Sequence, residues 1–444
     1  MLRVTAFLIG MSVSLAADAE PQVLRLHGSN TVGAELAPAL VDSWLRARGW
    51  TELKNVETKL DERVITAQRG GAQVRVEIHA HGTATGFADL AAESTDFAMA
   101  SRPVTAKELA SAQQMASLDS AQQEHVLALD GLALVVHPQN PLRALTMAQV
   151  KALFGGQINN WKALGGSDVP VRLYARDERS GTFDTFKSLV LGGLPLATAK
   201  RFESNRALVD SVLGDPAGIG FVGLNAVGKS KALAIADAQA LAILPTAATV
   251  ATEDYPLSRR LFLYHARVLS PLGREFLDYT LGDAGQNLVP AGGFVSMRIA
   301  ALQLKPPTRA PEEYQRLSEG AQRLSVNFRF NNSNAILDNR ALRDVKRIAN
   351  FMGRPENRDA TLRLAGFTDQ SFEMAYSELT LSESWADLVA SELNRAGVRV
   401  ERVRGFGSAL PVADNQSDAG RSRNRRVEVW FSRTSRGEYG SDSL

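Results

Sequence analysis

The chain has 444 residues, a net charge of +2 and 45% hydrophobic residues, which is ordinary for a folded globular protein of about three domains. The balanced charge gives no broad positive field that would indicate nucleic-acid binding. Cysteine is absent, so disulfides and thiolate metal sites are excluded. The six histidines form no pair at a metal-ligand spacing such as H-x-x-x-H, and we expect neither a metal nor a cofactor.

The N-terminus predicts a secretory signal peptide over residues 1–19. Arg3 gives a positive start, the segment from Val4 to Ala16 is apolar, and residues 17–19 form a small-x-small cleavage site. The apolar segment is too short to span a bilayer as a helix; a buried first strand is the alternative. We therefore expect an exported mature chain.

Residues 20–302 alternate short apolar runs with helical patterns, which is typical of βαβ units and an α/β fold. Strands are predicted over Val23–His27, Val74–His79, Phe97–Ala100, Leu132–Val136, Val169–Tyr174 and Ile219–Val222. Three strands, ending at His27, His79 and Tyr174, run into turns rich in Gly, Ser and Thr, and each turn precedes a helical pattern. Ligands of open α/β sheets bind at the carboxyl ends of strands, so these turns can converge on one ligand.

The segment from Arg176 to Thr182 reads R-D-E-R-S-G-T and lies between a predicted strand and a predicted helix. Such a turn directs free backbone N–H groups and the positive end of the helix dipole at one point. Arg176 can add a planar, permanently charged group there. This combination favours an oxyanion, while the alternative is that Ser180 and Thr182 only cap the helix.

The character of the sequence changes at residues 303–325, where Pro306, Pro307 and Pro311 oppose regular structure. We interpret this segment as a linker that allows the flanking domains independent motion. Residues 326–433 then show the order β-α-β-α-β-β of a compact α+β domain. The polar tail, residues 434–444, is predicted to be disordered.

Residues 23–295 resemble the phosphate-binding subunit of bacterial phosphate ABC transporters. The motifs that carry the resemblance are Gly28-Ser29-Asn30-Thr31-Val32-Gly33, Ala100-Ser101-Arg102-Pro103, Leu129 to Val136, Leu153-Phe154-Gly155-Gly156, Asn160-Trp161, Arg176 with Ser180-Gly181-Thr182, Tyr255-Pro256-Leu257-Ser258 and Gly285-Gln286. The resemblance implies a type II periplasmic binding protein with two α/β lobes, two crossing hinge strands and a cleft that closes on the anion. The phosphate ligands it implies are Thr31, Thr83, Ser101, Arg176, Ser180, Gly181 and Thr182.

One position departs from part of that family. Some members carry an aspartate after the serine that matches Ser101, and this aspartate accepts a proton from phosphate and so rejects sulfate. Arg102 stands there in this chain and can only donate hydrogen bonds. Discrimination against sulfate then requires another acceptor, such as Asp130 or Asp177; alternatively, Arg102 points away from the cleft and forms a surface ion pair.

Residues 326–431 resemble the OmpA-like domain, a family that binds peptidoglycan. The motifs are Gly366-Phe367-Thr368-Asp369, Leu381-Ser382-Glu383, Gly405-Phe406-Gly407, Pro411 to Asn415 and Asn424 to Glu428. The family uses an aspartate and an arginine to hold the diaminopimelate of the stem peptide, and Asp369 matches the aspartate. Trp385 replaces the arginine, so peptidoglycan binding is weakened, served by another cation such as Arg425, or replaced by a different ligand. Asn331 matches an asparagine that lines the pocket in some members.

The sequence therefore predicts an exported, non-enzymatic solute-binding protein. It binds an oxyanion, with inorganic phosphate first among the candidates, and is tethered to peptidoglycan in the periplasm, at the cell wall or outer membrane. An ABC permease is a partner that the resemblance allows. The alternatives are an envelope structural or adhesive protein, and a phosphatase of the same fold, for which we find no metal cluster and no Ser-His-Asp set.

Overall fold

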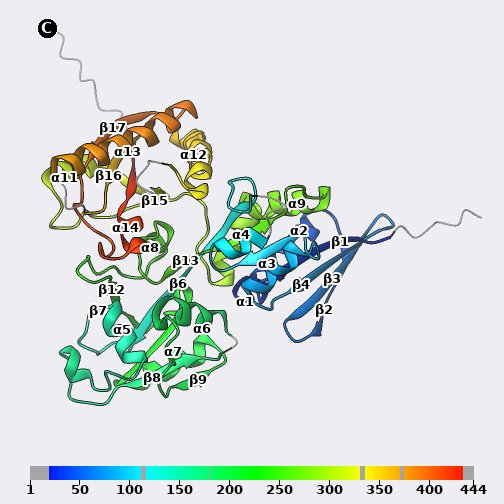
Figure 1. Ribbon diagram of the computed structural model, residues 1–444, viewed down its shortest axis with the longest axis horizontal. Coiled ribbons are helices and arrows are strands. Elements are labelled where there is room, and N and C mark those ends of the chain that lie inside the picture. The colour runs from blue at the N-terminus through cyan, green and yellow to red at the C-terminus, as the bar shows by residue number, and fades with distance from the viewer. Residues whose placement is uncertain (1–19, 112–116, 179, 331–335, 371–374, 434–444) are drawn as a thin grey trace, which may run out of the picture.

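The computed structural model describes residues 20–111, 117–178, 180–330, 336–370 and 375–433. The predicted signal peptide and C-terminal tail lie outside these residues. The described chain forms two lobes and a separate C-terminal domain, coloured from yellow to red in Figure 1. Within it, none of the helices combines the length and the apolar character needed to cross a bilayer.

One long, twisted sheet runs through both lobes. In the described part of the chain it has eleven strands, in the order β2-β3-β4-β1-β5-β13-β6-β10-β8-β9, with β11 paired to β6. The strands are β1 (Gln22–Gly28), β2 (Thr51–Lys59), β3 (Glu62–Arg69), β4 (Ala72–His79), β5 (Phe97–Ala100), β6 (Glu124–Val136), β8 (Arg172–Arg176), β9 (Lys200–Phe202), β10 (Gly218–Gly223), β11 (Lys231–Ala232) and β13 (Ser258–His265). A small second sheet joins β7 (Ala144–Thr146) and β12 (Ala234–Ala236).

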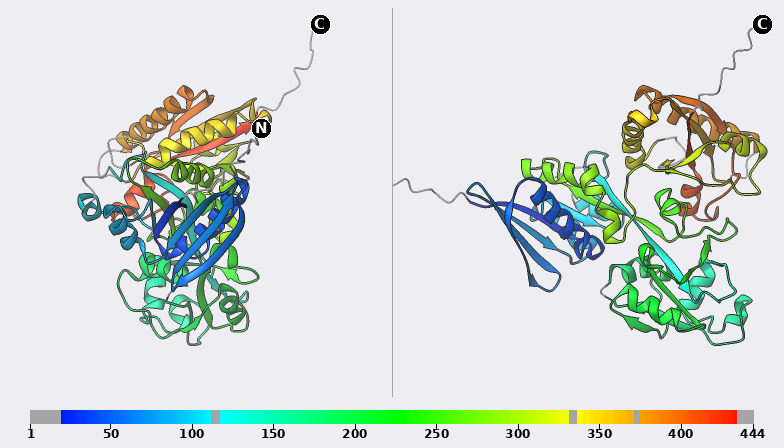
Figure 2. Two further views of the ribbon diagram at one scale, coloured as in Figure 1. Left: turned by 90° about the vertical axis from the view of Figure 1, so that its right-hand side faces the viewer. Right: turned by 180° about the vertical axis from the view of Figure 1, so that it is seen from behind.

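Strands β6 and β13 connect the lobes. The first part of β6 pairs antiparallel with β13, and its second part pairs antiparallel with β10 of the other lobe. In the right-hand view of Figure 2, β6 runs as a cyan strand from one lobe to the other. These two crossing strands confirm the predicted hinge of a two-lobed α/β binding protein.

Lobe 1 is built on β1 to β5 and is covered by helices on both faces. The helices are α1 (Asn30–Gly33), α2 (Leu36–Ala47), α3 (Thr83–Ala91), α4 (Ala106–Ser111), α9 (Pro271–Leu281) and α10 (Asp283–Gln286). On one face Trp44 of α2 packs edge-on against Phe276 of α9, with ring centroids 5.3 Å apart. On the other face α3 buries Phe87 and Leu90. The apolar residues of β1 and β4 pack with those of α2, and both strands were predicted from their alternation.

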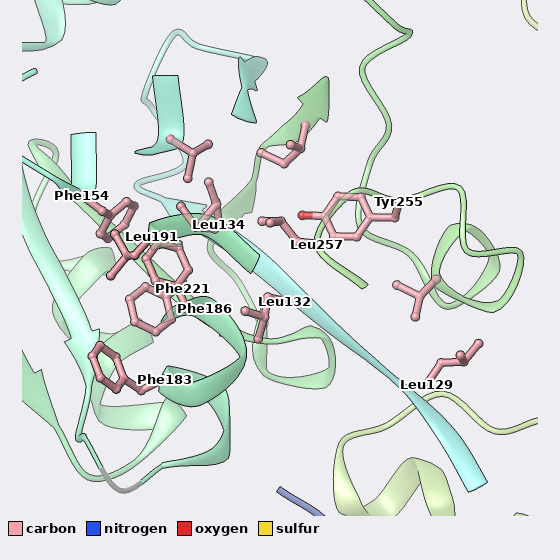
Figure 3. Packing of buried hydrophobic residues seen from close by; sticks show 14 of the residues in the cluster. Leu129, Leu132, Leu134, Phe154, Phe183, Phe186, Leu191, Phe221, Tyr255 and Leu257 are labelled. Carbon is pink, nitrogen blue, oxygen red and sulfur yellow. The ribbon is translucent and has the colours of Figure 1, made fainter. Parts of the chain in front are cut away.

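Lobe 2 is built on β8 to β11, with the helices α5 (Met147–Phe154), α6 (Gly181–Phe186), α7 (Asn205–Leu213) and α8 (Ala247–Ala251). Its core is aromatic (Figure 3). The rings of Phe186 and Phe221 stack with centroids 3.9 Å apart and an interplanar angle of 3°. Phe154 packs edge-on against Phe186. Because Phe183 and Phe186 are both buried, helix α6 is held firmly against β10.

The C-terminal domain confirms the predicted α+β fold. Its sheet has the order β14-β15-β18-β16-β17, formed by β14 (Ala301–Leu302), β15 (Gln322–Arg329), β16 (Ala360–Phe367), β17 (Val400–Gly405) and β18 (Arg426–Arg433). The helices are α11 (Glu312–Ser318), α12 (Asn339–Met352), α13 (Ala375–Arg395) and α14 (Asp418–Asn424). In α12 the buried Ala341, Ile348 and Met352 repeat at helical spacing and pack on the sheet.

Residues 303–325 differ from the expected linker. They include α11 and the first part of β15, and Tyr314 and Leu317 of α11 are buried. The Tyr314 hydroxyl donates to Glu428 Oε2 at 2.7 Å. This segment therefore belongs to the C-terminal domain, because its apolar side chains find a surface to cover.

The two domains are also in direct contact, contrary to the expected independent motion. Arg260 on β13 is 2.7 Å from Asp338 at the start of α12 and 2.5 Å from Glu253. Arg340 of α12 is 2.7 Å from the same Glu253. Four groups of alternating charge thus meet at the junction, where removing one partner from a buried pair costs about 3–5 kcal/mol.

Candidate functional site

A cavity of about 230 Å³ lies between the two lobes. Thr31 lines it from lobe 1, and Arg176, Ser180, Gly181 and Thr182 line it from lobe 2. Five of the seven predicted anion ligands therefore share one cavity. It sits where β1 and β8 end, which is the edge predicted from the turn sequences.

The turn after β1 is fixed by backbone contacts. Gly28 has φ +131°, and a Cβ there would lie 2.2 Å from the carbonyl oxygen of Met99, so only glycine fits. The next N–H, that of Ser29, donates to the same carbonyl at 2.8 Å. This close approach to β5 sets the position of α1 and so of Thr31.

On lobe 2, α6 begins at the cavity. Ser180 is its N-cap, and the Ser180 hydroxyl oxygen accepts the N–H of Phe183 at 3.0 Å. The capping role that the sequence left open is therefore real, but Ser180 lines the cavity as well. A hydroxyl that accepts one bond still has its own proton to donate. Gly181 lies against Thr31 of the other lobe: a Cβ at Gly181 would be 2.9 Å from Thr31 Cα.

Arg176, the last residue of β8, is half-buried, and burial lowers the pKa of its guanidinium from the ordinary value. Its Nη1 donates to Asn205 Oδ1 at 2.7 Å and its Nη2 to the carbonyl of Glu203 at 2.7 Å. Its Nε donates to the carbonyl of Phe202 at 3.3 Å. These partners are neutral oxygens, so they orient the guanidinium without cancelling its charge.

Arg259 on β13 contacts two residues that line the cavity, and the sequence did not predict it as a site residue. Its Nη2 donates to Thr31 Oγ1 at 2.8 Å and its Nε to Asp130 Oδ2 at 3.2 Å. Asp130 lines the cavity and also accepts the Thr185 hydroxyl at 2.7 Å. The sequence offers only a weak signal for Arg259, which directly follows the Tyr255 to Ser258 motif and is the first of two adjacent arginines.

Thr83 and Ser101 lie together, but they are not among the residues that line the cavity. Thr83 Oγ1 accepts the N–H of Ser101 at 3.1 Å and lies 3.2 Å from its hydroxyl. The structure thus places these two predicted ligands at the neighbouring strand ends, bonded to each other. Their assignment as phosphate ligands stays a prediction.

Arg102 forms a surface ion pair, which is the second of the two alternatives that the sequence left open. Its two Nη groups donate to the two oxygens of Glu108 at 2.8 and 2.7 Å, and this bond raises the pKa of Arg102. Arg102 is not a cavity-lining residue. Of the two carboxylates considered as proton acceptors, Asp130 lines the cavity and Asp177 does not.

In the C-terminal domain, Asp369 and Arg425 form an ion pair, with Arg425 Nη1 3.2 Å from Asp369 Oδ2. Arg425 is thus paired with Asp369, and its role as a substitute cation for a ligand stays a prediction. Trp385 is 1% exposed and stacks on Phe330 with ring centroids 4.9 Å apart, so it is a packing residue of the domain core. Asn331 lies outside the described residues.

The fold and the cleft together define a two-lobed solute-binding protein. Residues 52–284, slightly more than half of the chain, match the PBP superfamily domain, and residues 329–425 match the OmpA family. The chain belongs to the PBP superfamily and carries an OmpA-like domain at its C-terminus. The family is one of binding proteins and not of enzymes.

Individual relatives agree with this placement. The phosphate-binding protein PstS of Staphylococcus haemolyticus is 31% identical over 221 residues, 48% of this chain and 69% of that protein. Protein SphX of Synechococcus elongatus is 30% identical over 246 residues, 52% of this chain and 71% of that protein. A solved structure, a possible phosphate binding protein from Planctomyces limnophilus, is 25% identical with a TM-score of 0.50, over 63% of this chain and 94% of that one.

Proposed function

We propose that this chain is an exported receptor that binds inorganic phosphate between its lobes. The observation that carries the proposal is the interlobe cavity, where Arg176, the start of α6 and Thr31 converge. Its hydroxyls, backbone N–H groups and one charge-bearing arginine are the donors that a tetrahedral oxyanion requires. The phosphate-binding relatives support inorganic phosphate as the anion.

The test is calorimetric titration of residues 20–444 with phosphate and with sulfate in a chloride buffer. Arg176→Ala removes the described cavity-lining arginine, whose partners are neutral. We expect it to weaken phosphate binding by about 30- to 5,000-fold, because losing a buried charged partner costs about 2–5 kcal/mol. Arg172→Ala is the matched control: it lies on the same strand β8, is paired with Asp215 and is not a cavity-lining residue. Wild-type protein that binds neither anion would overturn the proposal.

We further propose that the OmpA-like domain holds the receptor on peptidoglycan. The support is the Asp369–Arg425 pair, which offers one carboxylate and one guanidinium to a ligand that carries an ammonium and a carboxylate. Export by the predicted signal peptide and delivery of phosphate to an ABC permease are parts of the same proposal.

Sedimentation of the protein with insoluble peptidoglycan tests this second role. We expect retention that Asp369→Ala abolishes. Asp387→Ala, on the exposed side of α13 in the same domain, is the matched control and should be retained like the wild type. Retention of Asp369→Ala at the wild-type level would refute the assigned site.

A further inference from the structure

A cluster of imidazoles and carboxylates covers one face of lobe 1. His27 at the end of β1 is opposite His79 at the end of β4, and His79 is opposite Glu62 of β3. Glu77, two residues before His79, points to the same face of the sheet. The three strands lie side by side in Figure 1. The rings of His27 and His79 stack with centroids 4.0 Å apart, and His81 continues the row at 5.8 Å.

His27 is oriented like a metal ligand. It is 5% exposed, and its Nδ1–H donates to Asp89 Oδ2 of α3 at 2.8 Å. That bond leaves the lone pair on Nε2, and His27 Nε2 is buried without a hydrogen-bond partner in the part of the chain that the structure describes. A carboxylate behind the ligating imidazole is the usual second layer of zinc sites, whereas an orphaned buried acceptor has a cost when nothing occupies it.

We propose that His27, His79 and Glu77 form a binding site for a divalent transition-metal ion of the Zn²⁺ class. One ligand atom from each lies within 4.8 Å of the others. A tetrahedral ion with bonds of about 2.1 Å brings its ligand atoms to roughly 3.4 Å of one another, so the side chains rotate inward on binding. Imidazole with carboxylate selects this class of metal over Mg²⁺ and Ca²⁺.

Two arginines contact the Glu77 carboxylate and would compete with the metal ion for it. Arg75 Nε donates to Glu77 Oε1 at 2.7 Å, and Arg25 Nε is 3.7 Å from Glu77 Oε2. Three carboxylates, those of Glu62, Glu77 and Asp89, balance these two guanidiniums and the exposed ammonium of Lys59, whose Nζ is 3.5 Å from Glu62 Oε2. His81, with its Nε2 3.5 Å from Glu62 Oε1, supplies a further imidazole at the exposed side.

The site lies directly behind two of the turns of lobe 1. His27 precedes Gly28, and His79 and His81 precede Gly82, whose N–H donates to the Gly28 carbonyl at 2.8 Å. A bound ion would therefore clamp β1 to β4 at the point where α1 and α3 begin. This proposal departs from our expectation that the chain holds no metal, and it does not depend on phosphate binding, because none of its three ligands lines the interlobe cavity.

The experiment uses untagged residues 20–444 in a phosphate-free chloride buffer. After dialysis against ZnCl₂ with excess MgCl₂, we expect about one zinc per chain by mass spectrometry. Asp89→Asn should weaken zinc binding about 10- to 100-fold and His79→Gln should abolish it, while His137→Gln in lobe 2 should bind like the wild type. Absence of retained zinc, or unchanged binding by His79→Gln, would overturn the proposal.

A measurement on the wild type guards against a variant that misfolds. Titration with zinc followed by ¹H–¹⁵N spectra of the imidazole rings should shift the signals of His27 and His79 and leave those of His125, His137 and His265 unchanged. Shifts confined to His125, His137 and His265, or no shifts at all, would reject the proposed metal site without the need for any substitution.

Discussion

A Gly181→Ala substitution distinguishes an effect on lobe closure, measured as anion affinity, from an effect on folding, measured as stability without the anion. Gly181 opens α6 on lobe 2, and a Cβ there would lie 2.9 Å from both Thr31 Cα and Thr31 Oγ1 on lobe 1. Ordinary contacts between carbon atoms are about 3.5–4.0 Å, so the lobes must separate by roughly 0.6–1 Å. Thr31 Cα is backbone and cannot rotate away.

The strain of such overpacking is about 1–3 kcal/mol. It acts only when the lobes touch, so it should appear in the anion affinity as a loss of about 5- to 150-fold. Within lobe 2 the substitution is neutral or favourable, because alanine exceeds glycine in helix propensity by up to about 1 kcal/mol. The thermal midpoint of the anion-free protein should therefore stay the same or rise.

Calorimetric titration with phosphate and thermal unfolding without it measure the two effects. Gly214→Ala is the control: Gly214 ends α7 of the same lobe with φ −88°, and a Cβ there meets nothing closer than 3.7 Å. If Gly181→Ala binds phosphate as tightly as the wild type, the bound form does not use this lobe contact. A fall in anion-free stability equal to the loss in affinity would assign the effect to folding instead.

Three further predictions follow from other parts of the structure. Asp130→Asn removes the cavity carboxylate that could accept a proton from phosphate. We expect the ratio of phosphate affinity to sulfate affinity, measured by calorimetry, to fall about 10- to 100-fold, because one hydrogen bond to a charged group is lost. An unchanged affinity ratio would exclude Asp130 as the acceptor. Arg425→Met leaves Asp369 without its guanidinium partner, so retention on peptidoglycan should drop severalfold. Adding Trp385→Arg to this variant should not restore retention, because Trp385 is buried against Phe330. Restored retention would contradict that packing. Burial, the charge of Arg343 and the neighbouring His265 lower the pKa of His125 to about 3, while its pKa in the unfolded chain is about 6.5. Between these values the unfolded chain binds a proton that the folded chain does not, so the stability should be full above pH 6.5 and fall toward pH 3, by about 2 kcal/mol at pH 5. Urea titrations should find this loss reduced in His125→Gln.

The regular elements were predictable where burial falls on one face. Phe97–Ala100 is β5 as predicted, and β4 begins two residues before the predicted Val74 and ends at the predicted His79. Alternation revealed β4, whose apolar residues pack with those of α2 on one face. Strand β5 is buried throughout and was predicted from its short apolar run. The hairpin of β2 and β3 was not predicted: β2 is almost wholly exposed, so its sequence carries no apolar alternation.

The candidate site was predictable in part. Arg176 and the Ser180 to Thr182 turn could be found because one short segment carries several donors. Arg259 could not, since it reaches Thr31 from a strand more than two hundred positions away. The histidine cluster was missed for the same reason, because its ligands come from neighbouring strands and motif spacing reports only ligands on one element.

The contact between the domains has a consequence for how a tethered receptor can work. The buried ion cluster of the interface includes Arg260 on the hinge strand β13, and Asn339 of α12 donates to Glu124 at the start of hinge strand β6 at 3.1 Å. On lobe 2, Arg423 is 3.4 Å from Asp237, and Arg340 donates to the carbonyl of Ala251 at the end of α8 at 2.7 Å. Residues next to the hinge strands change position least when the lobes open. We infer that the C-terminal domain holds the receptor beside its hinge strands and at α8 of lobe 2, so that the lobes can open at the cleft while the domain stays attached.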